Sequence, residues 1–245
     1  MTPTQRHEFF ARLAKVNPHP HSELRFGSPF ELLVSVVLAA QATDASVNKA
    51  TERLYAVANT PRAMLALGEG GLRDYIKTIG LYNTKAKHVL ALCQRLVDDF
   101  GGEVPRTREA LATLPGVGWK TASVVANVAF GAPTVAVDTH VFRVANRTGL
   151  APGKNPRAVC ALLERTVPAE YLPNAHHWLV LHGRYICKAR VPECWRCPVA
   201  DLCAYPDKTP APDTASARGP GGPPTDRRRR VEAAGKREAT PKKRK

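Results

Sequence analysis

Residues 114–122 read LPGVGWKTA, and they join two short stretches whose apolar residues are spaced as in helices. The stretch before them, 107–113, and the stretch after them, 121–128, both favour helix over strand. Gly116 and Gly118 permit positive φ angles and the close approach of another backbone. The pattern therefore predicts a helix–hairpin–helix unit.

The backbone amides of such a hairpin, and of the helix that follows it, point outward as a ready site for an anion. In a basic protein the anion that fits best is a DNA phosphate. We therefore expect DNA to be contacted by Gly116, Val117, Gly118 and Trp119. The alternative is an ordinary helical hairpin without a ligand.

Lys120 follows this turn directly, at the start of the second helix. The positive end of a helix disfavours a cation, and a neutral amine is a nucleophile. Asp138 ends the apolar run 135–137 and could take a proton from Lys120 or stabilise positive charge on a sugar ring. Two alternatives stay open: Lys120 could only touch phosphate, and Asp138 could only cap the next helix.

Helix signals recur along the chain, whereas alternation of period two is almost absent. A helix over 89–100 is stopped by two glycines, and the N-terminal 16 residues have an amphipathic helical pattern. The run 135–137 is too short to argue a sheet. The sequence predicts an all-α fold of many short helices. Helix caps are expected at Ser28 (a capping box with Glu31), Thr60, Asn155 and Asn174.

The chain has 245 residues, a formal net charge of +15 and a sequence pI of about 9.9. This balance indicates a polyanionic partner, nucleic acid before membrane. No apolar run is long enough to cross a bilayer and no secretory signal is visible, so we expect no membrane association and a cytoplasmic, reducing location.

Residues 207–245 differ in composition from the rest of the chain. They are rich in Pro, Gly, Ala and charge, and they carry 12 of the 36 Lys and Arg residues. Such a stretch buries too little apolar surface to fold, so a disordered basic tail is predicted. The tail could attract phosphates, or it could serve only as a solubilising extension.

Four cysteines lie within 17 residues, in the spacing C-x6-C-x2-C-x5-C: Cys187, Cys194, Cys197 and Cys203. Four thiolates can hold Zn²⁺ or an iron–sulfur cluster. The wide outer spacings favour the larger cluster, and Lys188 and Arg190 in the first loop are candidates for DNA phosphate contact. Cys93 and Cys160 lie on apolar helical faces and are expected in the core.

Taken together, these stretches resemble the endonuclease III family of base-excision DNA glycosylases over residues 5–206. The motifs that carry the resemblance are LLVSVVLAAQATD (32–44), TIGLYNTKA (78–86), LPGVGWKTA (114–122), AVDTHVFRV (136–144), LHGRY (181–185) and the four-cysteine loop. The resemblance implies two all-α domains, a six-helix domain over 22–132 and an iron–sulfur cluster domain made of 1–21 and 133–206. It also implies DNA bound in the groove between them.

The resemblance also implies a mechanism. An oxidised pyrimidine is flipped out of double-stranded DNA, Lys120 attacks C1′ to form a Schiff base, and β-elimination cuts the strand. Asp138 matches the catalytic aspartate, and Gln41 and Leu81 match residues that fill the gap in the duplex. By the same resemblance the four cysteines hold a [4Fe–4S] cluster, His140 belongs to the DNA interface, and abasic sites are also substrates. We expect a monomer.

The chain departs from the family pattern at two positions. Position 119 is usually arginine in this family and is Trp119 here, and Ala39 stands where some relatives carry serine. Trp119 therefore replaces a cation beside the nucleophile by a large aromatic side chain. We expect this to change lesion preference or to lower turnover.

Three other interpretations compete with this one. A sister family that removes adenine opposite oxidised guanine shares the hairpin and cluster, but it lacks the hairpin lysine. A non-catalytic DNA-binding protein with a redox-sensing cluster would need neither Lys120 nor Asp138. A zinc-bound helix–hairpin–helix module would lack the visible absorption band of an iron cluster.

Replacing Trp119 by arginine is expected to alter activity on duplex DNA that carries thymine glycol, because it restores a cation next to Lys120. The measurement is the rate of base release on several oxidised pyrimidines. Unchanged kinetics on all of them would refute a role for Trp119 in substrate choice or rate.

Overall fold

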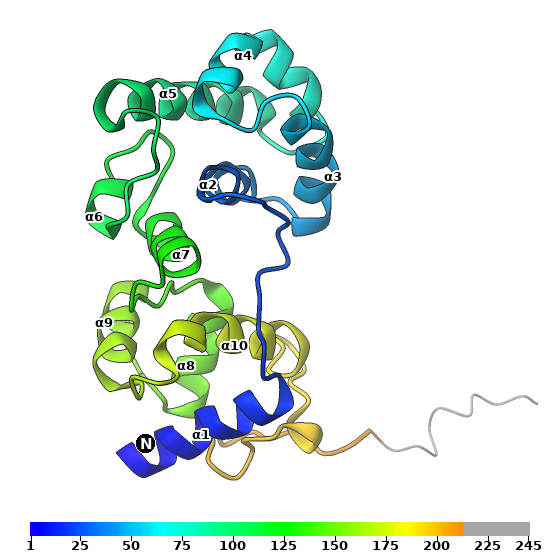
Figure 1. Ribbon diagram of the computed structural model, residues 1–245. Helices are drawn as coiled ribbons and strands as arrows, with labels where there is room; N and C mark the ends of the chain where they lie inside the picture. The colour runs from blue at the N-terminus through cyan, green and yellow to red at the C-terminus, as the bar shows by residue number, and fades with distance from the viewer. Residues whose placement is uncertain (213–245) are drawn as a thin grey trace, which may run out of the picture. The chain divides into compact units, whose positions relative to one another are not determined.

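The computed structural model describes residues 1–212, and within them the predicted all-α class is confirmed. Residues 1–211 form one compact unit, shown in Figure 1, while residues 213–245 of the predicted basic tail lie outside the described residues. The helices of the described part are α1 (Pro3–Val16), α2 (Pro29–Leu38), α3 (Asp44–Tyr55), α4 (Pro61–Ile76), α5 (Tyr82–Phe100), α6 (Arg108–Leu111), α7 (Trp119–Phe130), α8 (Thr139–Thr148), α9 (Pro156–Thr166), α10 (Leu172–Tyr185) and the 3-10 helix η1 (Cys194–Arg196).

Most of the predicted helix starts are confirmed. The side chains of Ser28, Thr60 and Asn155 each accept a hydrogen bond from a first-turn amide, and proline follows each cap. The capping box at Ser28 is only half formed, because Glu31 accepts from the amide of Gly27 instead of that of Ser28.

The cap predicted at Asn174 is wrong. Helix α10 begins at Leu172, so Asn174 lies inside its first turn, and the N-cap Tyr171 makes no side-chain capping bond. Pro173 occupies one of the first two positions of the helix, where proline is well tolerated.

Helix α2 is the centre of a first core. Eight of its ten residues are buried, and an all-round apolar helix must be enclosed by others. Figure 1 shows α2 with α3, α4, α5 and α7 around it, and their buried side chains form one cluster with those of α6. Helix α4 bends around this cluster at Gly68, whose φ of 70° a side chain would disfavour.

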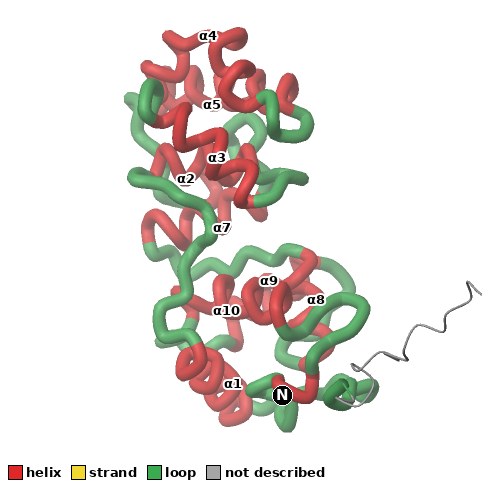
Figure 2. Tube along the Cα trace, turned by 90° about the vertical axis from the view of Figure 1, so that its right-hand side faces the viewer, coloured by secondary structure: helices red, strands yellow, loops and turns green. Residues whose placement is uncertain are grey.

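A second core joins the N-terminal helix α1 to α8, α9 and α10. Phe9 and Phe10 of α1 are fully buried in it, and Phe10 stacks on Tyr171 and lies near Trp178. Figures 1 and 2 both show α1 beside α10. Apart from Ala136, the members of the two cores lie on the two sides of the predicted boundary between 22–132 and the rest. Both cores belong to one compact unit, so separate domains stay a prediction.

The segment 134–137 passes between the two cores. Val135 and Val137 are buried in the second core, whereas Ala136 between them is buried in the first. Alternate side chains of an extended chain point to opposite sides, which explains this distribution. The described residues contain no strand, so the segment is extended without being part of a sheet.

No helix in the described part of the chain is both long enough and apolar enough to span a bilayer.

Replacing Phe10 by alanine is expected to lower the free energy of unfolding by about 3–5 kcal/mol, because it opens a cavity in the second core. Val16 on the same helix is exposed, so Val16→Ala should change the free energy of unfolding by less than about 0.5 kcal/mol. Urea unfolding measures both values. Equal stabilities of the two variants would show that α1 is not part of that core.

Candidate active site

The hairpin between α6 and α7 depends on Gly116. Its φ is 75°, and a Cβ atom placed there would lie 2.9 Å from Cβ of His88 on α5. Both the backbone angle and the space exclude a larger residue. The next residue, Val117, donates its amide to Leu114 at 3.1 Å and buries its side chain in the first core. Val117 therefore anchors the hairpin, and its contact with DNA stays a prediction.

Helix α7 begins without a side-chain cap. Its N-cap is Gly118, which has no side chain that could bond to the first-turn amides. The amides of this turn, which include those of Trp119 and Lys120, therefore have no intrahelical or capping partner. Lys120 itself is exposed on this first turn. The arrangement suits an anion in front of the hairpin, as the sequence predicted.

Lys120 and Asp138 line the same pocket, which has a volume of about 610 Å³. Asp138 is the N-cap of α8, and its Oδ1 accepts a hydrogen bond from the amide of Val141 at 2.8 Å. The two alternatives for Asp138 are thus compatible, since one side chain both caps a helix and faces the pocket. The cap bond holds the carboxylate in place on the side of Lys120.

Two neutral histidines form part of the pocket wall. His176 donates from Nδ1 to the carbonyl oxygen of Ala136 at 2.8 Å, and burial lowers the pKa of this histidine. Burial, and the nearby His176 and His21, lower the pKa of His177 to about 4. Both rings are therefore uncharged at neutral pH, and they add no positive charge around Lys120.

One edge of the pocket is closed by a cluster of charged side chains. Arg184 of α10 pairs with Asp44 at 2.9 Å and with Glu23, which also accepts from the hydroxyl of Tyr185. Burial raises the pKa of Asp44, and the charge of Lys120 partly offsets this. The pairs tie α10 to the start of α3, and so connect the two cores across the pocket.

Gln41 and Leu81 occupy two turns with unusual backbone conformation. They are the non-glycine residues with positive φ among the described residues, at 55° and 60°. The turns are neighbours, because a Cβ atom on Gly80 would lie 3.9 Å from the backbone oxygen of Gln41. Both residues are exposed, Leu81 by 60%. Such strain is maintained where a side chain must be held in a particular direction.

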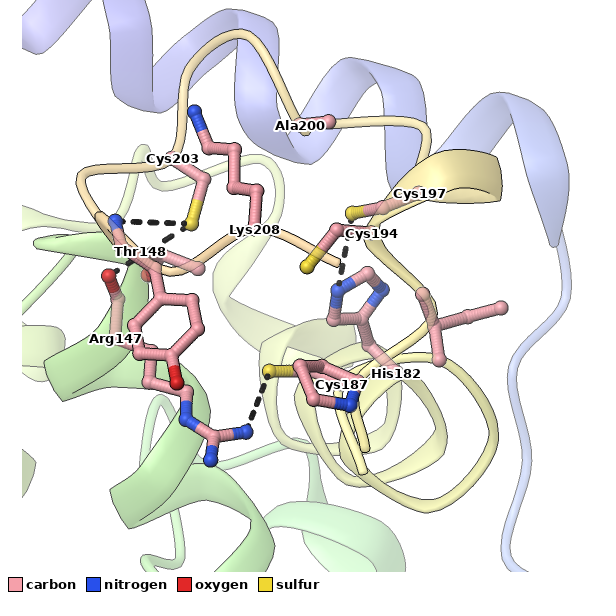
Figure 3. Close-up of a pocket in the computed structure, with 12 residues that line it drawn as sticks. Arg147, Thr148, His182, Cys187, Cys194, Cys197, Ala200, Cys203 and Lys208 are labelled. Atoms are coloured by element: carbon pink, nitrogen blue, oxygen red, sulfur yellow. Dashed lines mark hydrogen bonds between the residues drawn. The ribbon is translucent and has the colours of Figure 1, made fainter. Parts of the chain in front are cut away.

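The four cysteines of the C-terminal loop line one pocket, and Figure 3 shows their side chains directed toward a common space. All four are free thiols in this structure. Nη1 of Arg147 lies 3.8 Å from Sγ of Cys187, so a cation faces the sulfur ligands. Within the described residues no three His, Cys, Asp or Glu side chains are grouped around a single ion position. The donor set suits a metal centre that four thiolates can surround.

Two arginines of α8 hold the first part of this loop. Arg147 donates to the carbonyl oxygens of Lys188 and Ala189 at 2.7 and 2.8 Å, and Arg143 donates to that of Cys187 at 2.9 Å. The ammonium of Lys188 pairs with Glu193, whereas Arg190 is exposed. The loop is therefore fixed against α8. DNA contacts of Lys188 and Arg190 stay predictions.

Two other predicted contact residues lie near the pocket. His140 lines it, packs against Gly183 and has Nδ1 3.2 Å from Nη2 of Arg143. Trp119 has its ring 4.3 Å from the guanidinium carbon of Arg108, and 5.8 Å from that of Arg157. The aromatic side chain beside Lys120 is thus accompanied by two cations. Positive charge remains at this corner of the fold despite the replacement at position 119.

Comparison with known proteins agrees with this geometry. A family model described as "HhH-GPD superfamily base excision DNA repair protein" matches residues 34–169. The endonuclease III of Escherichia coli (strain K12) is 59% identical over 208 residues, which cover 85% of this chain and 99% of that protein. This chain belongs to the endonuclease III family. The endonuclease III of Haemophilus influenzae is 56% identical with the same coverage.

A solved structure of a trapped endonuclease III–DNA covalent intermediate is similar in fold. Its TM-score is 0.78 at 45% identity, and the match covers 83% of this chain and 96% of that one. As a member of the endonuclease III family, the chain is a DNA glycosylase of base excision repair with apurinic/apyrimidinic lyase activity.

Several pocket residues were not singled out from the sequence. Asp44 is the last residue of one quoted motif, and Arg184 lies within another. No local pattern indicated that these two side chains would pair. His176 and Glu23 lie outside those motifs altogether. Only the packing of α10 against the start of α3 and against the chain that leads into α2 brings these side chains to one pocket.

The cap formed by Asp138 can be tested by substitution. Asp138→Ala removes the acceptor for the amide of Val141 and is expected to lower the free energy of unfolding by about 1 kcal/mol. Asp138→Asn keeps an acceptor of equal capping strength and should stay within a few tenths of a kcal/mol of the parent protein. Urea unfolding measures the free energy of unfolding of both variants and of the parent protein. A loss of the same size in both variants would show that the negative charge, not the cap, stabilises the fold.

Proposed function

We propose that this enzyme removes oxidised pyrimidines from double-stranded DNA and cuts the strand through a Schiff base on Lys120. The observation that carries the proposal is the placement of Lys120 and Asp138 on one pocket of about 610 Å³. A pocket of this size accommodates a flipped nucleotide between the amine and the carboxylate. The solved covalent intermediate of a related endonuclease III with DNA supports a covalent route.

The reaction needs a neutral amine on Lys120 and an acceptor for its proton. The Nζ lone pair attacks C1′, the glycosidic bond breaks, and its electron pair leaves with the base. Asp138 stabilises the positive charge that develops on the sugar and accepts a proton from the amine. The nitrogen lone pair then expels O4′, which takes up the proton that Asp138 had accepted. The sugar ring opens to an iminium ion, which acidifies the proton on C2′. Loss of that proton expels the 3′ phosphate and cuts the strand.

An abasic site already lacks its base. It enters the same sequence at the attack on C1′, so abasic sites are also substrates of the proposed reaction.

The proposed DNA interface surrounds this pocket. Gln41 and Leu81, on their strained and adjacent turns, would enter the duplex where the nucleotide has left. The amides of the hairpin, at Gly116, Gly118 and Trp119, would bind a backbone phosphate. Arg190 and Lys188 would contact phosphate from the cysteine loop, and His140 would contact DNA from the rim of the pocket.

We further propose that Cys187, Cys194, Cys197 and Cys203 hold a [4Fe–4S] cluster. When bound, the cluster would tie both ends of the loop that carries Lys188 and Arg190, and it takes no part in the chemical steps above. Its support is the pocket that the four cysteine side chains share, with Arg147 facing Cys187. We also propose that the protein acts as a monomer in the cytoplasm, where its DNA substrate would be.

Borohydride trapping on a duplex with one thymine glycol tests the nucleophile. The parent protein is expected to form a covalent adduct with DNA. Lys120→Ala should abolish it, because no other lysine among residues 1–212 lines the pocket. Lys15→Ala, an exposed lysine on α1, is the matched control and should trap normally.

Three results of this experiment would contradict the proposal in different ways. Base release without any adduct would indicate a monofunctional enzyme that uses Asp138 and water. An adduct that persists in Lys120→Ala would assign the nucleophile to another amine. Binding of DNA with neither adduct nor base release would show that the pocket is inactive on this lesion.

A further inference from the structure

Trp119 starts a chain of contacts that ends next to the catalytic carboxylate. The guanidinium carbon of Arg108, on the first turn of α6, lies over the Trp119 ring, 4.3 Å from the ring centroid. The same guanidinium donates from Nη1 to Oε1 of Glu164 on α9 at 2.6 Å. Oε1 of Glu164 in turn accepts from the backbone amide of Val135 at 3.1 Å.

The two ends of this series of contacts lie close in sequence to the two residues of the proposed catalytic pair. Trp119 is the residue directly before Lys120, and Val135 belongs to the segment that runs into Asp138. The lysine belongs to a helix of the first core, whereas the aspartate caps a helix of the second core. A series of contacts that joins the two cores therefore affects the distance between Lys120 and Asp138.

The middle of the chain is largely shielded from water. The side chain of Arg108 is 17% exposed and that of Glu164 is 21% exposed, so their ion pair is screened less than a surface pair. The thiol of Cys160 adds a second bond, with Sγ 3.3 Å from Oε1 of Glu164 and 3.3 Å from the carbonyl oxygen of Val135. Burial raises the pKa of this thiol to about 11, which keeps it a donor.

Trp119 supplies the surface on which Arg108 rests. Nε of Arg108 has no hydrogen-bond partner among the described residues, and its nearest acidic group is Oε1 of Glu109 at 3.8 Å. The indole ring adds a cation–π contact to this guanidinium. Arg157 of α9 approaches the same ring at 5.8 Å and connects it to the second core directly.

We propose that Trp119 is a positioning residue, which acts through Arg108 and Glu164 to hold Lys120 and Asp138 at the separation that the reaction needs. The proposal rests on the function proposed above and names a determinant of its rate. It assigns one face of the Trp119 ring to the contact with Arg108, although the residue remains 37% exposed.

The test separates the rate at saturation from DNA affinity. Covalent adduct formation is measured in single turnover with enzyme in excess on a thymine glycol duplex. Binding to an undamaged duplex is measured in parallel. Trp119→Ala is expected to lower the saturated rate by about tenfold with unchanged affinity, because small misplacements of reacting groups are costly. Trp119→Phe retains an aromatic face and should stay within about threefold of the parent.

A double-mutant cycle tests the path of the effect. Glu164→Gln removes the charge that holds Arg108 and should lower the saturated rate to a similar extent. The double variant Trp119→Ala/Glu164→Gln should be no slower than the slower single variant, because both changes break one chain. Tyr75→Ala is the matched control, since Arg53 lies 5.8 Å from that ring in a cation–π pair of α3 and α4. Its saturated rate should equal that of the parent.

The contrary results are distinct. A weaker affinity of Trp119→Ala with an unchanged saturated rate would make the ring a DNA contact and overturn the inference. A double variant whose loss of rate equals the product of the two single losses would also overturn it, because the two residues would then act independently. A saturated rate of Trp119→Ala equal to that of the parent would overturn it as well. If the parent protein forms no adduct at all, the proposed function fails, and the positioning role fails with it.

Discussion

The site depends on satisfying the backbone of one buried, extended segment, residues 134–137. It lies between two cores and belongs to no sheet. The amide of Thr134 donates to the carbonyl oxygen of Ala132, but the next polar groups are bonded to side chains. Glu164 accepts from the amide of Val135, Cys160 donates to the carbonyl of Val135, and His176 donates to that of Ala136. Because α9 and α10 provide these partners, the position of the segment, and of Asp138 at its end, follows from the packing of the second core.

Lys120 and Asp138, the two proposed catalytic residues, occupy helix starts that are built in opposite ways. Helix α8 begins with Asp138 as its own cap, which fixes the carboxylate. Helix α7 begins at Gly118 without a cap, which leaves amides free beside Lys120. One helix start thus holds a negative group still, and the other has free amides that suit the phosphate proposed to bind there. The close approach of Gly116 to His88 sets the second arrangement, because it fixes the hairpin on α5.

The parts of the site that follow from local rules were predictable. Caps before prolines, the glycine stop after α5 and the hairpin at 114–118 each have a physical cause within a few residues. The cap predicted at Asn174 was wrong although it rested on the same kind of local signal. Helix α10 begins two residues earlier, and Pro173 fits inside its first turn. The positive φ angles of Gln41 and Leu81 carry no such local signal, since neither residue type favours them.

The sequence by itself determined the helical class, the hairpin, the thiol donor set and, through its motifs, the pair Lys120 and Asp138, because these are encoded in residue types and short spacings. Only the tertiary structure decided which distant groups meet. Arg184 and Asp44 come together across the pocket, and Arg108 and Glu164 join Trp119 to Val135. The residues of each pair lie 140 and 56 positions apart in the chain, so their contact is set by packing of helices between two cores, which no local pattern specifies.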